Sequence, residues 1–199
     1  MILREYERQR EFFNSRAREW NFSDEDRKSA EDIISKISFF PFDVILDVGC
    51  GIGNLLSILK NRAPESTFIG LDFAFRMLQQ YKYKNNGKSN IVLGLGEELP
   101  IKSESVNVIM NYCFFPHLRF KNIAIREYYR VLRKGGRYFI IHPQGRKAIN
   151  AVHHSAGEPV CDDILEPIDE ICNMLKDQSF ILKKSIDSND IFMIEAQKL

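Results

Sequence analysis

Short apolar runs alternate with amphipathic segments through the middle of the chain. The runs are strand-sized and rich in β-branched residues, as strands buried on both faces are. The segments between them carry apolar residues at helical spacing. This alternation predicts a mostly parallel sheet with helices on both faces. The predicted strands are residues 44–49, 67–72, 90–95, 106–113 and 137–142, and the predicted helices between them are residues 54–62, 74–84 and 120–133.

The two ends of the chain depart from this alternation. Residues 3–20 and 24–37 predict helices, the second with Ser23 as its N-cap. Residues 180–186 and 191–197 flank a short polar turn, which predicts an antiparallel hairpin. Two further helices are predicted at residues 146–154 and 167–178.

The composition is that of an ordinary globular protein, with 199 residues, 44% apolar and 28% charged. We expect one domain, with a helical cap over residues 1–40 and an α/β core over residues 41–199. The net charge of +1 comes from mixed charges without a basic face, which argues against a nucleic-acid partner. No apolar run is long enough for a membrane segment, and the first twenty residues lack a signal-peptide core. We therefore expect a cytoplasmic protein with its four cysteines reduced, since none forms a C-x-x-C pair.

The stretch VILDVGCGIGN, residues 44–54, joins a predicted buried strand to a predicted helix through three glycines. Gly49, Gly51 and Gly53 suit a tight turn or a backbone that a ligand approaches closely. The next strand ends at Asp72, whose carboxylate could accept two hydrogen bonds from a ribose diol. A helix N-cap is the alternative role for Asp72.

The glycine spacing bears on the kind of cofactor. A dinucleotide site favours G-x-G-x-x-G, whereas this chain has G-x-G-x-G preceded by Asp47. An acid beside the turn repels a pyrophosphate and attracts a cation. The pattern favours a nucleoside that carries an amine or a sulfonium, and a nicotinamide-dependent oxidoreductase is the alternative.

Four motifs follow one another along the chain: VILDVGCGIGN, FIGLDFAFRML, NIVLGLGEELPIKSESVNVIMNYCFFPHL and EYYRVLRKGGRYFIIHP. In this order they resemble the class I S-adenosylmethionine-dependent methyltransferases, and within them the type 11 group that includes ubiquinone- and menaquinone-type enzymes. The similarity covers about residues 8–145. It implies a Rossmann-like seven-stranded sheet of order 3-2-1-4-5-7-6, with the last strand antiparallel.

The resemblance also implies roles for residues at matching positions. Those expected along the methionine end of S-adenosylmethionine are Asp47, Gly49, Cys50, Gly51, Gly53 and Asn111. Those expected at the ribose and adenine are Asp72, Phe73, Gly96 and Glu97, with Phe13 and Trp20 on an N-terminal helix that closes over the site. Leu95 departs from the family pattern, which usually has an Asp there that meets the adenine amino group.

Candidate acceptor groups follow the fourth and fifth predicted strands, because ligands bind at the carboxyl ends of parallel strands. His117 is a candidate general base, or a residue that orders its loop. Arg146, Asn150 and His153 (or His154) fall on one face of a predicted helix beside His142, which suggests a site for a carboxylate or phosphate; an exposed polar helix is the alternative.

The segment GEPVCDDILEP, residues 157–167, is predicted to form a loop over this mouth. A zinc site of His142, His153, His154 and Cys161 has no compact ligand spacing, so we expect no metal.

The leading hypothesis is therefore an S-adenosylmethionine-dependent methyltransferase that acts on a small molecule, without nucleic-acid or membrane partners. A nicotinamide-dependent oxidoreductase is the second hypothesis. A cofactor-binding or partner-binding relative without catalysis is the third, and Leu95 is the feature that favours it. The sequence does not indicate the methyl acceptor or the oligomeric state.

Overall fold

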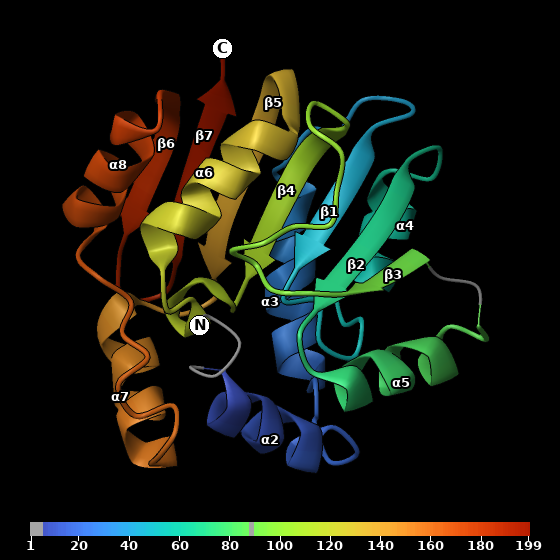
Figure 1. The fold of residues 1–199 in the computed structure, drawn as a ribbon, viewed down its shortest axis with the longest axis vertical. Coiled ribbons are helices and arrows are strands. Elements are labelled where there is room, and N and C mark those ends of the chain that lie inside the picture. The colour runs from blue at the N-terminus through green and yellow to red at the C-terminus, as the bar shows by residue number, and fades with distance from the viewer. Residues whose placement is uncertain (1–5, 88–89) are drawn as a thin grey trace.

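The computed structural model describes residues 6–87 and 90–199, so the first residues of the predicted helix 3–20 lie outside the described residues. Seven strands form one sheet of order β3-β2-β1-β4-β5-β7-β6, as the resemblance implies (Figure 1). β7 pairs antiparallel with both β5 and β6, and the other pairs are parallel. The strands are β1 (Val44–Val48), β2 (Thr67–Asp72), β3 (Asn90–Leu93), β4 (Val106–Tyr112), β5 (Leu132–His142), β6 (Phe180–Asp187) and β7 (Phe192–Lys198).

Helices cover both faces of the sheet (Figure 1). They are α2 (Glu7–Arg16), α3 (Asp24–Ser35), α4 (Leu56–Arg62), α5 (Phe75–Lys84), α6 (Lys121–Val131), α7 (Arg146–Ala156) and α8 (Ile168–Asp177), with a short 3₁₀ helix η1 (Phe115–His117) after β4. Ser23 caps α3 as predicted: it accepts from the Asp26 amide, and the Asp26 side chain accepts in return from the Ser23 backbone.

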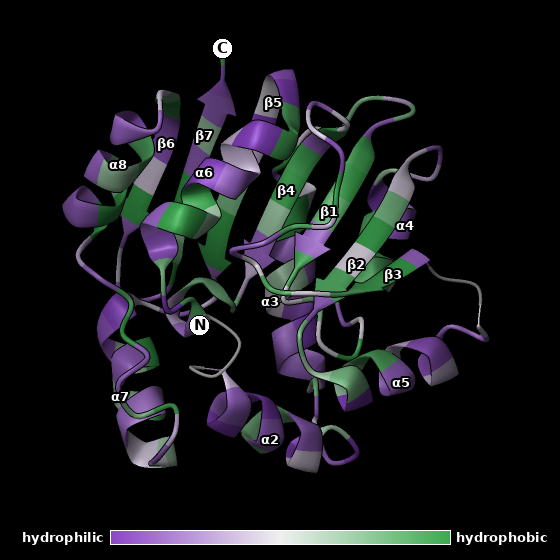
Figure 2. Cartoon of the chain, viewed as in Figure 1, coloured by the Kyte–Doolittle hydropathy of each residue, from purple (hydrophilic) through white to green (hydrophobic). Residues whose placement is uncertain are grey.

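Neighbouring residues of the central strands point to opposite faces, which divides the core in two. Leu46 of β1 and Ile109 of β4 pack in the cluster that contains α6 and α8. Ile45 and Val108 pack in the cluster that contains α3 and α4. Both faces of these strands are therefore buried, and the strands are hydrophobic along most of their length (Figure 2).

A cap lies across the carboxyl ends of the parallel strands, and it consists of α2, α7 and residues 157–167 (Figure 1). Gln9 of α2 donates to Asp163 of the 157–167 segment at 2.6 Å. Val160 of the same segment is buried in one cluster with Phe13 of α2 and Met77 of α5. The expectation that residues 157–167 form a loop at this edge agrees with the structure.

Several predicted boundaries differ from the observed ones, and the predicted strand 137–142 begins five residues earlier, at Leu132 of β5. Helix 120–133 ends at Val131, before Gly135 and Gly136, because the buried Leu132 turns extended and begins β5 opposite Val106. Strand 90–95 ends at Leu93, where the Gly94 amide donates to the Asp72 carbonyl instead. Helix 3–20 is shorter at its C-terminal end, because α2 gives way to single turns after Arg16. Among the described residues, no helix is both long and apolar enough to cross a membrane.

Candidate active site

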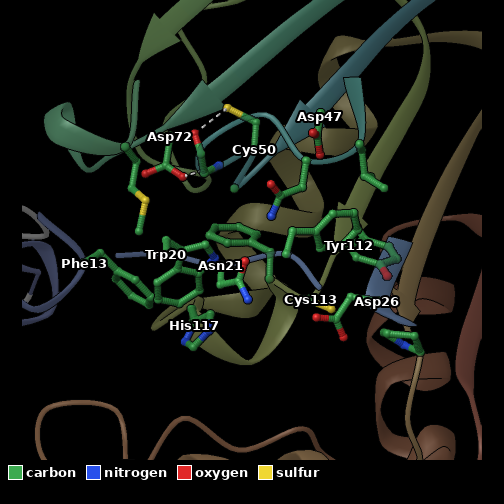
Figure 3. A pocket seen from close by; sticks show the side chains of 18 of the residues that line it. Phe13, Trp20, Asn21, Asp26, Asp47, Cys50, Asp72, Tyr112, Cys113 and His117 are labelled. Atoms are coloured by element: carbon green, nitrogen blue, oxygen red, sulfur yellow. Dashed lines mark hydrogen bonds between the residues drawn. The ribbon is translucent and has the colours of Figure 1, made fainter. Parts of the chain in front are cut away.

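A cavity of about 380 Å³ opens at the carboxyl ends of β1, β2 and β4, beneath the cap. Figure 3 shows two acids on its sheet side and aromatic rings and a histidine facing them. From the sheet and its turns come Asp47, Gly49, Cys50, Gly51, Asp72, Phe73, Tyr112, Cys113 and Phe114. The cap, α3 and the segment that follows α2 contribute Phe13, Trp20, Asn21, Phe22, Asp26 and Val152. The wall also includes His117, Asn54, Leu55, Met77 and Pro143.

The turn after β1 brings its backbone to the floor of the cavity. The Gly49 and Cys50 amides both donate to the Leu71 carbonyl, at 2.8 and 3.0 Å. Gly49 has φ +76°, and a Cβ there would lie 2.0 Å from the Phe114 ring. Gly51 has φ +53°, and a Cβ there would meet nothing within 4 Å. The first glycine therefore permits close packing, and the second leaves open space above the backbone.

Two buried carboxylates lie beside this turn. Asp72 accepts hydrogen bonds from the Gly51 amide at 2.9 Å and from the Ala74 amide at 2.8 Å. The carboxylate therefore holds both the glycine turn and the start of the segment leading to α5. Asp47 forms no hydrogen bond or ion pair through its carboxylate with any described residue.

Burial raises the pKa of both carboxyl groups. The pKa of Asp47 rises to about 7, mainly because burial disfavours the charged form and secondarily because Asp72 is close. Burial also raises the pKa of Asp72, to about 6, and the hydrogen bonds from the Ala74 and Gly51 amides oppose this rise. A cation in the cavity would favour the ionised carboxylates and so lower both pKa values.

These raised pKa values predict that the free protein loses stability as the pH rises. Asp47 is protonated below about pH 7 when folded but ionises near pH 4 when unfolded, so its stabilising contribution is lost between these values. Between pH 5 and pH 8 we expect wild type to lose on the order of 2 kcal/mol relative to Asp47→Asn, which cannot ionise. Urea unfolding of both proteins at the two pH values measures this difference, and parallel pH profiles would contradict it.

The aromatic residues of the cap lie over the cavity. Phe13 of α2 contacts Trp20 and Phe73, with ring centroids 5.7 and 5.9 Å apart. It also meets the His117 ring edge-on, at 5.1 Å. Phe13 and Trp20 thus both line the cavity, but Trp20 lies in the segment after α2 and not on the helix predicted to carry both residues.

Four predicted cofactor residues lie away from the cavity wall. Gly53 packs against Tyr81, and Gly96 against Leu118 and Tyr128. Asn111 is fully buried, where it donates to the Val48 carbonyl at 3.3 Å and accepts from the Tyr138 hydroxyl. These contacts join strands and helices of the core.

Glu97 is the fourth of these residues, and it anchors the cap. Its carboxylate accepts from the Tyr6 hydroxyl and from the amides of Arg119 and Phe120, at 3.1 and 3.2 Å. Burial raises the pKa of this carboxyl group. Leu95 nearby lines a separate cavity together with Phe73 and Tyr6, so Phe73 lies between the two cavities.

The predicted acceptor groups are divided between two environments. His117 lines the cavity, and its Nδ1 lies 2.7 Å from Asp163 Oδ2. His142 is buried behind the wall with neither ring nitrogen hydrogen-bonded to a described residue. Burial and the nearby histidines His117 and His153 lower the pKa of His142 to about 3.

Arg146, Asn150 and His153 have structural partners instead of facing the cavity. Arg146 pairs with Asp187 of β6 at 3.3 Å, and Asn150 bonds the backbone N–H and carbonyl of Leu165 at 2.9 and 3.1 Å. His153 Nδ1 bonds the Asp163 carbonyl, and burial lowers the pKa of His153. These contacts attach α7 to β6 and to residues 157–167, so they do not form the predicted anion site.

Sequence reasoning missed Gln9 and Asp163, which bond each other and His117. Their only sequence signal is the acidic pair in the predicted loop 157–167. Within residues 6–87 and 90–199, no group of three or more His, Cys, Asp or Glu side chains could hold a metal ion.

Comparisons with known proteins relate this chain to methyltransferases. A family model described as a methyltransferase domain matches residues 46–140. The chain is 32% identical to an arsenite methyltransferase of Halobacterium salinarum over 105 residues, which cover 50% of this chain and 27% of that protein. It is 30% identical to a ubiquinone/menaquinone biosynthesis C-methyltransferase of Geotalea daltonii over 122 residues, covering 58% and 52%. The matches thus span between about a quarter and a half of these two curated relatives.

A solved structure shares the fold over most of its length. It is a putative methyltransferase in complex with the Trm112 methyltransferase activator of Haloferax volcanii, with a TM-score of 0.74 at 17% identity, over 87% of this chain and 90% of that one. Residues 46–140, which include the glycine turn, Asp72 and β4, are therefore identified as a type 11 methyltransferase domain, and the solved structure shows that its fold extends over most of the chain.

Proposed function

We propose that this protein transfers a methyl group from S-adenosylmethionine to a small molecule. The observation that carries the proposal is the pairing, in one cavity, of the glycine turn and two buried acids with an aromatic wall and a histidine. The bound cofactor supplies the electrophilic methyl group, so the protein has mainly to position the acceptor.

The residues on the sheet side of the cavity fit this cofactor. The open space over Gly51 can receive a ligand close to the backbone. Asp72 has lone pairs left for ribose hydroxyls, because each carboxylate oxygen can accept more than one hydrogen bond. Asp47 lacks a described countercharge, so it suits the cationic methionine end.

The acceptor side supports a small, partly apolar molecule. Its wall includes Trp20, Phe22 and Phe114, and the cap covers it. Two of the curated relatives are named for arsenite and for ubiquinone/menaquinone biosynthesis, and both names indicate small-molecule acceptors. We place the reaction in the cytoplasm, because Cys50, Cys113, Cys161 and Cys172 are free thiols.

Calorimetric titration with S-adenosylhomocysteine and S-adenosylmethionine tests the proposal, with NAD as control. We expect both nucleosides to bind with dissociation constants on the order of 10 μM, and NAD not to bind. Failure of both nucleosides to bind would contradict the proposed function. It would direct attention to Leu95, which lacks the carboxylate that family members usually present to adenine.

A further inference from the structure

Three separate segments meet at the His117 ring. His117 lies at the end of η1, Asp163 lies in the 157–167 segment, and Gln9 comes from α2. Asp163 Oδ2 lies 2.7 Å from His117 Nδ1 and 2.6 Å from Gln9 Nε2. Gln9 Nε2 also reaches the His117 carbonyl at 3.4 Å. The cap therefore holds both the carboxylate and the histidine backbone.

The environment of Asp163 determines which nitrogen of His117 carries the proton. The Asp163 side chain is 3% exposed, and no described Lys or Arg pairs with it. An ionised carboxylate only accepts hydrogen bonds, so Nδ1 of a neutral His117 must carry the hydrogen it donates. The lone pair is then left on Nε2.

The His117 ring borders the cavity, and its Nε2 atom is the ring nitrogen that the protein leaves available. His117 is 13% exposed, it lines the cavity, and Nε2 has no hydrogen-bond partner among the described residues. Phe13 and Phe114 flank the ring, with centroids 5.1 and 6.5 Å away. A nitrogen lone pair in an apolar wall can take a proton from a reacting group held there.

Resting on the proposed function, we infer that His117 is the general base of the reaction and Asp163 is its positioning residue, and that the acceptor is a phenol-like hydroxyl compound. The oxygen lone pair forms the new O–CH₃ bond as the S–CH₃ bond breaks, and that bond's electron pair stays on sulfur. The hydroxyl proton moves to His117 Nε2. The products are a methyl ether, S-adenosylhomocysteine and a protonated imidazole.

The charges around His117 suit this proton transfer. Asp163 is in direct contact and Asp72 is near enough to interact electrostatically, so two carboxylates stabilise the imidazolium. The His153 ring lies 4.8 Å from the His117 ring, and His142 also interacts with it electrostatically. Burial lowers the pKa of both neighbours, so they stay neutral and do not oppose the charge. Phe13 and Phe114 flank the ring and Trp20 contacts Phe13, so these aromatic side chains match an aromatic acceptor body.

A hydrogen bond between His117 and Asp163 that served only to hold the loop would show the same distances. The first test therefore measures which ring nitrogen of His117 carries the hydrogen. The chain has four histidines, and in ¹⁵N-histidine protein with bound S-adenosylhomocysteine the His117→Asn spectrum assigns the signal of His117. At pH 8 we expect the Nδ1–H form of His117 in wild type. Asp162→Asn should show the same form, and it is the matched control because Asp162 is the exposed neighbour of Asp163. Asp163→Leu, which keeps a side chain of similar size but has no acceptor for the Nδ1 hydrogen, should lose this preference. An Nε2–H form in wild type would overturn the inference.

The second test separates base catalysis from cofactor binding. We would compare methylation of 4-methylphenol by S-adenosylmethionine with methyl transfer from iodomethane to S-adenosylhomocysteine, which releases iodide and moves no proton. In His117→Asn the ratio of the first rate to the second should fall about 100-fold, and in Asp162→Asn it should not change. An unchanged ratio in His117→Asn overturns the role of the base, and absence of phenol methylation by wild type overturns the acceptor class. If the wild-type protein did not bind S-adenosylhomocysteine at all, that result would instead contradict the proposed function.

Discussion

Gly49→Ala is expected to lower the free energy of unfolding by about 3 kcal/mol. Two costs add at this position. The backbone has φ +76°, which disfavours any side chain, and the new Cβ would lie 2.0 Å from Phe114. Because Phe114 is nine-tenths buried between the turn and η1, it cannot move aside without shifting its neighbours. Urea unfolding of wild type and variant measures the loss.

Gly51→Ala is the matched control, two residues further along the same turn. It also has a left-handed backbone, at φ +53°, but its Cβ would meet nothing within 4 Å. The expected loss of stability is therefore only about 1 kcal/mol. The methyl group would instead occupy the space assigned to the cofactor and weaken S-adenosylhomocysteine binding. Equal losses of stability in the two variants would show that the contact with Phe114 is not the cause.

Asp72→Asn is expected to weaken S-adenosylhomocysteine binding about 100-fold, or roughly 2.7 kcal/mol. An amide has one acceptor oxygen where the carboxylate has two, and Asp72 already uses both of its oxygens on the Gly51 and Ala74 amides. The NH₂ group of asparagine would face one of these N–H donors. The variant also removes the negative charge that strengthens hydrogen bonds to ribose hydroxyls. Calorimetric titration gives the two affinities.

Asp190→Asn provides the control for this loss, because Asp190 is exposed in the turn between β6 and β7. Its affinity for S-adenosylhomocysteine should equal that of wild type. If Asp72→Asn retained wild-type affinity while remaining folded, Asp72 would serve only to hold the turn and the segment leading to α5.

The strands of this fold are predictable because each is locally distinct. Residues 67–72 match β2 at both ends, and residues 44–49 and 106–113 each exceed the observed strand by one residue. Their burial on both faces makes them continuous apolar runs, which a local pattern reveals. The strand order came from the family resemblance, since it depends on crossovers that no local pattern records.

The end of α6 shows where local reasoning fails. Gly135 and Gly136 are strong helix stop signals, but the helix ends earlier, at Val131. The amides of Glu104 and Ser105 donate to the carbonyls of Arg130 and Val131. Pairing with a segment distant in sequence therefore sets this boundary.

The candidate site was predictable on its sheet side and less so on its acceptor side. Asp47, Gly49 and Asp72 belong to compact motifs whose spacing carries their meaning. Gln9 and Asp163 are 154 residues apart, and they meet only because the cap folds across the strand ends. The histidines on and before α7 looked accessible in sequence, but His142 is buried and His153 bonds a backbone carbonyl.

The antiparallel course of β7 has a practical consequence for handling this protein. The parallel strands end at the cavity. Because β7 runs the other way, the chain reaches Lys198 at the opposite ends of the strands, away from the cavity (Figure 1). An affinity tag or surface linker fused after Leu199 would sit far from the cavity. A fusion on the N-terminal side of Tyr6 would lie next to the residue whose hydroxyl donates to Glu97, and it could disturb the contact that anchors the cap. Immobilisation for binding assays should therefore use the C-terminal end.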